Sequence, residues 1–191
     1  MNPPYIDSQE FKGKNYTATP FTKADYDNCS FINCNFLGID ISNNQFIECH
    51  FIDCNFSLSK IKNTGLKNVH FEKCKMVGLN FSECDPFLLE LKFTRCQLNL
   101  ASFYKLKLKN TSFVNCQLNE TDFVETDLTN ALFDTCDFKL AVFDNTLLTK
   151  SDFSSSYHYS IDLEKNNIKK ATFSKDGLAG LLEKYQLIIT E

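Results

Sequence analysis

Cysteine and histidine are the residues of this sequence with the most obvious chemical potential. The chain contains nine Cys and three His, and Cys29, Cys34, Cys49, His50 and Cys54 lie close enough in sequence to suggest a zinc site. The alternative is that these cysteines fill small interior positions of a repeated structure. We favour that interpretation because each of them falls on the five-residue repeat described below. The sequence therefore predicts no metal site and no cofactor.

Sequence signatures of catalytic centres are absent. The chain has no G-x-S-x-G or H-E-x-x-H motif, no phosphate-binding glycine loop and no dinucleotide-binding fingerprint. Its many Ser and Asp residues occupy repeat positions, where packing explains them. We predict that the protein has no catalytic residue and is not an enzyme.

Composition limits the environment and the partners. The net charge of −4 argues against nucleic acid as a direct ligand. No apolar run approaches the ~18 residues that span a bilayer, and the first residues lack the features of a signal peptide. We expect a cytoplasmic protein with reduced thiols and no membrane association.

Apolar residues recur at every fifth position through almost the whole chain. The first run extends from Phe11 to Phe81, and after a slip of two residues a second run begins at Leu88 and ends at Phe173. Eighteen of the 19 Phe fall in this register, and only His158 breaks the apolar rule. A period of five fits neither an α-helix nor a simple long strand.

A second position, two residues earlier, holds small side chains such as Cys34, Cys54 and Thr121. Residues i and i−2 of an extended chain point to the same side, and the residue between them points away. A square coil satisfies this pattern, with five residues on each side and 20 in each turn. Phe31, Phe51 and Phe71 then stack as one ladder, and the chain has room for roughly eight coils about 4.8 Å apart.

The pattern A/C-(D/N)-(L/F)-x-x over residues 11–173 resembles the pentapeptide-repeat family. This resemblance implies an all-β fold, the right-handed quadrilateral β-helix. Residues 1–10 are then an N-terminal lead-in, and residues 174–191 form a separate C-terminal segment.

The repeat is interrupted within residues 82–92. Two residues are inserted around Pro86, which cannot donate a ladder hydrogen bond. We expect a bulge or short loop formed by Asp85, Pro86 and Phe87, with Phe87 displaced from the core. This bulge is either a recognition point or a neutral change in length.

His158 marks a second irregularity. It falls in an inward position above Phe138, and we interpret it as an interior or corner residue rather than a catalytic one. His50 and His70 are expected to stack outward on neighbouring coils.

The period changes again in the C-terminal segment. Leu178, Leu181, Leu182 and Tyr185 recur as on one helical face, and Gln186 to Thr190 is typical of a short strand. The segment resembles the C-terminus of the Qnr quinolone-resistance proteins, in which the tail joins two rods end to end. That resemblance implies a homodimer; the residues concerned are Leu178, Leu181, Leu182, Tyr185, Leu187, Ile188 and Ile189.

Charge is distributed unevenly along the chain. Residues 60–109 hold ten Lys or Arg against four acids, whereas residues 119–164 hold ten acids against Lys139 and Lys150. On the square coil one side would carry an outward acidic row, which could imitate DNA phosphates or simply solvate the rod. The expected row is Asp122, Glu125, Asp144, Asp162 and Glu164.

The resemblance to the Qnr group implies a DNA-mimicking protein that binds DNA gyrase or topoisomerase IV and protects it from quinolones or a toxin. The chain lacks the longer projecting loops of Qnr proteins, and its middle is basic. The alternative function is a structural or regulatory scaffold for another cytoplasmic protein.

Overall fold

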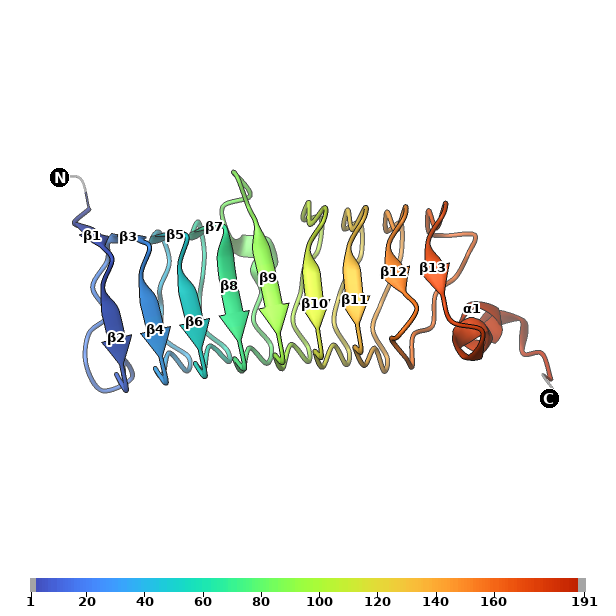
Figure 1. Ribbon diagram of the computed structural model, residues 1–191, viewed down its shortest axis with the longest axis horizontal. Helices are drawn as coiled ribbons and strands as arrows, with labels where there is room; N and C mark the ends of the chain where they lie inside the picture. The colour runs from blue at the N-terminus through green and yellow to red at the C-terminus, as the bar shows by residue number, and fades with distance from the viewer. Residues whose placement is uncertain (1–2, 189–191) are drawn as a thin grey trace.

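The computed structural model describes residues 3–188, which form a rod of stacked parallel coils (Figure 1). Two parallel sheets run along the rod. The shorter has the order β1-β3-β5-β7 and the longer the order β13-β12-β11-β10-β9-β8-β6-β4-β2. The other two sides are joined by isolated parallel bridges. The nine rungs of the longer sheet enclose eight coil spacings, as the 20-residue period predicts.

The strands are short because each side of the square has only five residues. The shorter sheet contains β1 (Tyr5–Asp7), β3 (Asp25–Asp27), β5 (Gln45–Ile47) and β7 (Gly65–Lys67). The longer sheet contains β2 (Glu10–Lys12), β4 (Ser30–Ile32), β6 (His50–Ile52), β8 (Val69–Glu72), β9 (Leu91–Thr94), β10 (Ser112–Val114), β11 (Leu132–Asp134), β12 (Asp152–Phe153) and β13 (Thr172–Phe173). Since β1 pairs with β3, the ladder begins within residues 1–10, the segment expected to be a lead-in.

The corners of the square are made by residues in the left-handed backbone region. Asn28, Asn33 and Asn43 have φ of 48°, 53° and 58° and are typical of these corners. Asn is one of the few non-glycine residues that enters this region readily. The same conformation recurs on every side, which is how the chain turns after each short extended stretch.

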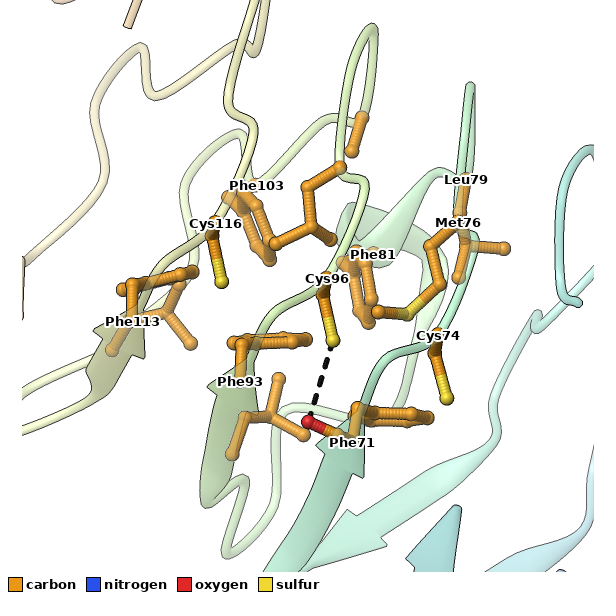
Figure 2. Close-up of a cluster of buried hydrophobic side chains, with 14 of the residues drawn as sticks. Phe71, Cys74, Met76, Leu79, Phe81, Phe93, Cys96, Phe103, Phe113 and Cys116 are labelled. Carbon is orange, nitrogen blue, oxygen red and sulfur yellow. Dashed lines mark hydrogen bonds between the residues drawn. The ribbon is translucent and has the colours of Figure 1, made fainter. Parts of the chain in front are cut away.

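The predicted aromatic ladders fill the interior. Phe31 and Phe51 have ring centroids 4.8 Å apart with an interplanar angle of 15°, and Phe93 and Phe113 are 4.9 Å apart at 13°. Rings on adjoining sides meet edge to face, as Phe81 and Phe93 do at 85°. Figure 2 shows these columns meeting in the middle of the rod. Burial of each Phe side chain stabilises the fold by about 2–3 kcal/mol, as judged from the apolar area removed from water.

The small interior positions also form hydrogen bonds between coils. The Cys96 thiol donates to the Phe71 carbonyl at 3.3 Å, the bond drawn in Figure 2. The Thr121 hydroxyl donates to the Leu98 carbonyl at 3.0 Å in the same way. Cys, Ser and Thr are therefore suited to this position by their donors as well as by their size.

The interruption changes the register by two residues at one point. Gly65 pairs with Asp85, 20 residues later, whereas Phe71 pairs with Phe93, 22 residues later. The extra residues therefore lie after Asp85 and before β9, following the 3-10 turn η1 (Phe81–Glu83). The shorter sheet ends at β7, on the coil that precedes the inserted residues. The loop projects beyond the top edge of the rod beside β9 in Figure 1.

Two interior assignments from the sequence were wrong. Leu88 is 65% exposed with a φ of 55°, because it forms a corner of the inserted loop, and Leu89 packs against the core instead. His158 is not in the inward position to which the period assigned it, but it is the corner residue that was the other alternative, exposed and with a φ of 59°. The buried Tyr159 takes the inward place and packs against Phe153 and Phe173.

The C-terminal segment forms a short, irregular helical stretch at one end of the rod (Figure 1). It comprises η2 (Asp176–Leu178), α1 (Ala179–Leu182) and η3 (Glu183–Tyr185). The predicted strand is not formed over Gln186 to Ile188, and its remaining residues lie outside the described part of the chain. Within residues 3–188, no helix has the length and apolarity needed to cross a bilayer.

Candidate partner-binding surfaces

The five predicted acidic residues lie on one side of the rod, but most of them are paired with lysines. Asp122 forms a bridge with Ser102 on the preceding coil and with Val142 on the following coil, which places it on the column expected from the sequence. Glu125 lies at the next corner, and its carboxylate is 3.5 Å from Lys105 Nζ. Asp144 Oδ2 is 3.1 Å from Lys165 Nζ. The expected continuous anionic row is therefore interrupted by cations.

A single lysine from the C-terminal segment binds the last two carboxylates. Lys184 Nζ lies 2.7 Å from Asp162 Oδ1 and 2.8 Å from Glu164 Oε2. Tyr185 donates its hydroxyl to Glu164 at 2.9 Å. The Lys184 ammonium lowers the pKa of both carboxyl groups, and they in turn raise the pKa of Lys184. These carboxylates anchor the tail, which leaves less of their charge for a partner.

Three carboxylates of the same region, Asp122, Asp134 and Asp152, make no ion pair within the described residues, whereas Asp127 pairs with Lys109 and Asp137 with His158. Asp134 belongs to β11 and Asp152 to β12, on the long sheet. Asp134 accepts a hydrogen bond from Ser155 Oγ at 2.9 Å, and Asp152 accepts one from the Ser154 amide at 2.9 Å. Asp122 likewise accepts from the Ser102 hydroxyl and the Val124 amide. These three carboxylates lie half-buried at the surface and are bound by hydrogen-bond donors rather than by cations.

The sequence contained a signal for part of this pairing. Residues about 20 apart lie on adjacent coils, and Lys105 with Glu125 and Lys165 with Asp144 have that separation. Lys184 gave no such signal, because it lies beyond the repeat. Asp134 and Asp152 could have been singled out by searching the same region for acids with no basic residue one coil away.

The predicted dimerisation residues do not share one exposed face. Leu181 is buried at 7% exposure, and Leu182 is half-buried. Leu178 and Tyr185 are about half exposed, whereas Leu187 and Ile188 are exposed at 58% and 94%. Ile189 lies outside the described residues. Leu181 therefore closes the end of the rod, and the exposed apolar surface is concentrated at Leu187 and Ile188.

Two glycines bring the helical segment close to the rod. A Cβ atom at Gly180 would lie 1.9 Å from the Tyr159 carbonyl oxygen, and one at Gly177 would lie 1.8 Å from the Tyr159 hydroxyl. The Ile161 amide also donates to the Gly180 carbonyl at 3.0 Å. A groove of about 820 Å³ remains beside this contact, between the helical segment and the exposed Leu140.

The interruption forms the bulge expected from the sequence. Asp85 still pairs with Gly65, Pro86 is exposed, and Phe87 is 64% exposed. Asp85 Oδ1 accepts a hydrogen bond from the Phe87 amide at 3.0 Å. Phe87 is thus the one Phe outside the repeat in sequence and outside the core in structure.

The sequence also matches a family model, described as the pentapeptide repeat region, over residues 24–92 and 87–173. The chain belongs to the pentapeptide-repeat family. The two matched segments overlap at residues 87–92, within the interruption.

Several solved pentapeptide-repeat structures resemble this one in fold. Full-length QnrB1, described as a plasmid-mediated fluoroquinolone resistance protein, has a TM-score of 0.63 and 16% identity over 96% of this chain and 100% of QnrB1. A trypsin-treated variant of QnrB1 has a TM-score of 0.59 and 17% identity over 100% of this chain and 93% of that one. HetL, from the cyanobacterium Nostoc, has a TM-score of 0.44 and 16% identity over 90% of both chains. No curated protein matches the sequence.

The pentapeptide repeat also explains the thiols and imidazoles that first suggested a metal site. All nine cysteines are free and buried, and burial raises the pKa of Cys49 and of Cys84 to about 12. His50 and His70 lie on neighbouring coils, but their rings meet edge to face rather than stacking, with centroids 5.7 Å apart and an interplanar angle of 71°. Burial also lowers the pKa of His70. Within residues 3–188, no three His, Cys, Asp or Glu side chains are grouped to hold a metal ion.

Proposed function

We propose that this protein acts by binding another protein, without catalysis, and that its partner is a type II topoisomerase, DNA gyrase or topoisomerase IV. The rod would occupy the DNA-binding groove of the enzyme and shield it from quinolones or a toxin. The observation that supports this most is that three carboxylates on the C-terminal coils, Asp122, Asp134 and Asp152, form no ion pair with any residue in the described part of the chain. QnrB1, of similar length and fold, is described as a fluoroquinolone resistance protein.

Charge density is the physical requirement for DNA mimicry. B-DNA carries about one negative charge per 1.7 Å of its axis. Residues 119–164 carry ten carboxylates against two lysines, over roughly two coils of about 4.8 Å each. This density is at least that of DNA before the neighbouring lysines Lys105, Lys109, Lys165 and Lys184 are counted, and it falls below that of DNA afterwards. The anionic surface available to a topoisomerase is therefore centred on the long sheet, at Asp134 and Asp152.

A homodimer formed through the C-terminal tail would double this surface. Leu187 and Ile188 are exposed beside the groove that Leu140 and Leu182 line. Packing of one tail against the groove of a second copy would bury the apolar side chains of both. Light scattering tests this: Leu187→Asp with Ile188→Asp should give a monomer, whereas Leu58→Asp, on an equally exposed leucine far from the tail, should not change the mass.

A DNA supercoiling assay with purified gyrase, with and without a fluoroquinolone, tests the topoisomerase proposal. The protein should alter supercoiling or restore it in the presence of the drug, and Asp134→Lys with Asp152→Lys should abolish the effect. Asp7→Lys with Asp53→Lys makes the same charge change on the N-terminal coils and should leave the effect intact. No effect of the unaltered protein at micromolar concentration would exclude this function.

A scaffold for a different protein is the second candidate. The lysines that neutralise Glu125, Asp144, Asp162 and Glu164 favour it, as does the excess of basic residues in the middle of the rod. Affinity capture with the rod as bait would identify such a partner if gyrase does not respond.

A further inference from the structure

The interrupted coil presents an apolar surface that the topoisomerase proposal does not use. Phe87 and Leu88 are adjacent in sequence and are 64% and 65% exposed. Single exposed apolar residues are common on soluble proteins and need no explanation. Two large neighbouring side chains at the tip of the one inserted loop form a distinct feature. Most other Phe side chains of the described chain are buried within the rod, and only Phe11, Phe21 and Phe173, at its ends, are partly buried.

The loop that carries them is held in place at both ends. The Phe87 amide donates to Asp85 Oδ1 at 3.0 Å. The Glu90 amide donates to the Leu66 carbonyl at 3.1 Å, and the Glu90 carbonyl accepts from the Val69 amide at 2.9 Å. Lys67 Nζ lies 5.5 Å from the centroid of the Phe87 ring. A contact surface that is already ordered loses little conformational entropy on binding.

A groove of about 610 Å³ runs beside Leu88. Its apolar lining comes from Ile47, Leu88, Leu89 and Leu91, and its polar rim carries three lysines and two glutamates: Lys67, Lys92, Lys109, Glu48 and Glu90. Lys109 is 3.3 Å from Asp127, and Lys67 and Lys92 make no ion pair in the described structure. The groove therefore combines aliphatic walls with a rim of both charges, on which Lys67 and Lys92 are available to bind carboxylates.

The groove lies in the most basic part of the molecule. Residues 60–109 contain ten Lys or Arg and four acids. A positively charged surface is repelled by the basic groove with which a topoisomerase binds DNA. The basic residues 60–109 and the acidic residues 119–164 therefore suit different partners.

We propose that this groove binds an extended, acidic segment of a partner protein that carries a large aliphatic side chain. The aliphatic side chain would pack on Leu88 and Leu89, and the flanking carboxylates would bind Lys67 and Lys92. A peptide segment fits better than nucleic acid, because it can place a large aliphatic side chain against Leu88 and Leu89. Its backbone amides can also donate hydrogen bonds to Glu48 and Glu90 on the rim. This binding would not require the topoisomerase interaction.

Fluorescence polarisation with a labelled synthetic peptide tests the proposal. The probe is a short peptide of Asp and Glu with a central pair of Leu, and its controls are the same peptide with Ala for Leu and a labelled single-stranded DNA oligonucleotide. The full-length protein should bind the Leu peptide and bind both controls at least tenfold more weakly.

Two variants locate the binding to the groove. Phe87→Ser with Leu88→Ser should weaken peptide binding at least tenfold, whereas Leu58→Ser with Leu100→Ser, on exposed corner leucines of the same backbone conformation, should not. Lys67→Glu with Lys92→Glu should weaken it similarly, and Lys12→Glu with Lys14→Glu, the same charge change at the N-terminal end, should not. Circular dichroism and thermal melting of each variant verify the fold.

Three results would overturn the proposal. The Leu peptide could fail to bind, or it could bind equally well to Phe87→Ser with Leu88→Ser. Tighter binding of the oligonucleotide than of the Leu peptide would assign the basic surface to nucleic acid instead. None of these results bears on the supercoiling assay, so the two proposals fail separately.

Discussion

The middle coils and the C-terminal coils have the same interior and opposite exteriors. Phe93 and Phe133 are both fully buried in the same ladder. Outside, residues 60–109 are basic and carry the projecting loop, whereas residues 119–164 are acidic and lead to the helical segment. The repeat therefore fixes only the inward positions, and the outward positions are free to specify different partners along one rod.

The largest expected effects test whether the two interiors are equivalent. Phe93→Ala and Phe133→Ala should each lower the free energy of unfolding by about 3–5 kcal/mol, because each leaves a cavity in a stacked column. Chemical denaturation measures this. Phe87→Ala is the matched control and should stay within about 0.5 kcal/mol, since its ring is exposed. A large difference between Phe93→Ala and Phe133→Ala would show that the interiors are not equivalent.

An intermediate effect is expected where the C-terminal segment meets the rod. Gly180→Ala should cost about 1–3 kcal/mol or release the segment, because the new methyl group collides with a backbone oxygen of Tyr159. The Ile161 amide, which donates to Gly180, should then exchange faster with deuterium. Gly177→Ala should also disturb the contact, because the Tyr159 hydroxyl that it meets is fixed to a buried ring. Equal exchange in all three proteins would mean that this contact does not hold the segment.

A smaller effect should depend on pH. The lowered pKa values of Asp162 and Glu164 stabilise the docked segment above their unfolded pKa values, and this contribution is lost as pH falls through the folded values. The raised pKa of Lys184 stabilises it below the unfolded value near ~10.4 and is lost only at higher pH. Docking should therefore weaken in acid, below about pH 4. Methyl NMR signals of Leu181 would report this, and Lys184→Met should remove most of the pH dependence.

The smallest expected effect concerns the lysines on the acidic side. Lys105→Met with Lys165→Met should free Glu125 and Asp144 and increase the effect on gyrase by roughly two- to fivefold, as expected for exposed ion pairs. The supercoiling assay measures it. Neither lysine lines the groove beside Leu88, so the affinity for the acidic peptide should stay unchanged. A decrease in the effect on gyrase would mean that these carboxylates are not part of the contact.

The sequence predicted the repeat and its ladders because a five-residue period admits few structures. The five-residue period assigned the wrong residues to the interior at two corners. Leu88 and His158 adopt the left-handed backbone conformation of a corner and point outward, and the next residues, Leu89 and Tyr159, point inward instead. The hydrogen bonds of the small interior positions were not predicted, because residue size alone explained the pattern.

The candidate site was less predictable than the fold. The sequence period placed the acidic residues on one side of the rod. It did not predict their ion pairs with lysines of the next coil and of the C-terminal segment, because these depend on the side-chain conformations of the lysines. The bulge was foreseen from Pro86, whereas the groove beside it depends on how Leu89 and Leu91 pack.

Because the register between adjacent coils is constant, each coil adds the same rise along the axis of the rod. Adjacent rungs differ by 20 residues everywhere except at the interruption, where the two extra residues are absorbed without shifting Phe93 from the column of Phe71. Insertion or deletion of one complete turn would therefore translate the acidic coils relative to the loop by about 4.8 Å, with almost no change in the direction either surface faces. Evolution could in this way adjust the separation of two partners in discrete increments while preserving every contact within each.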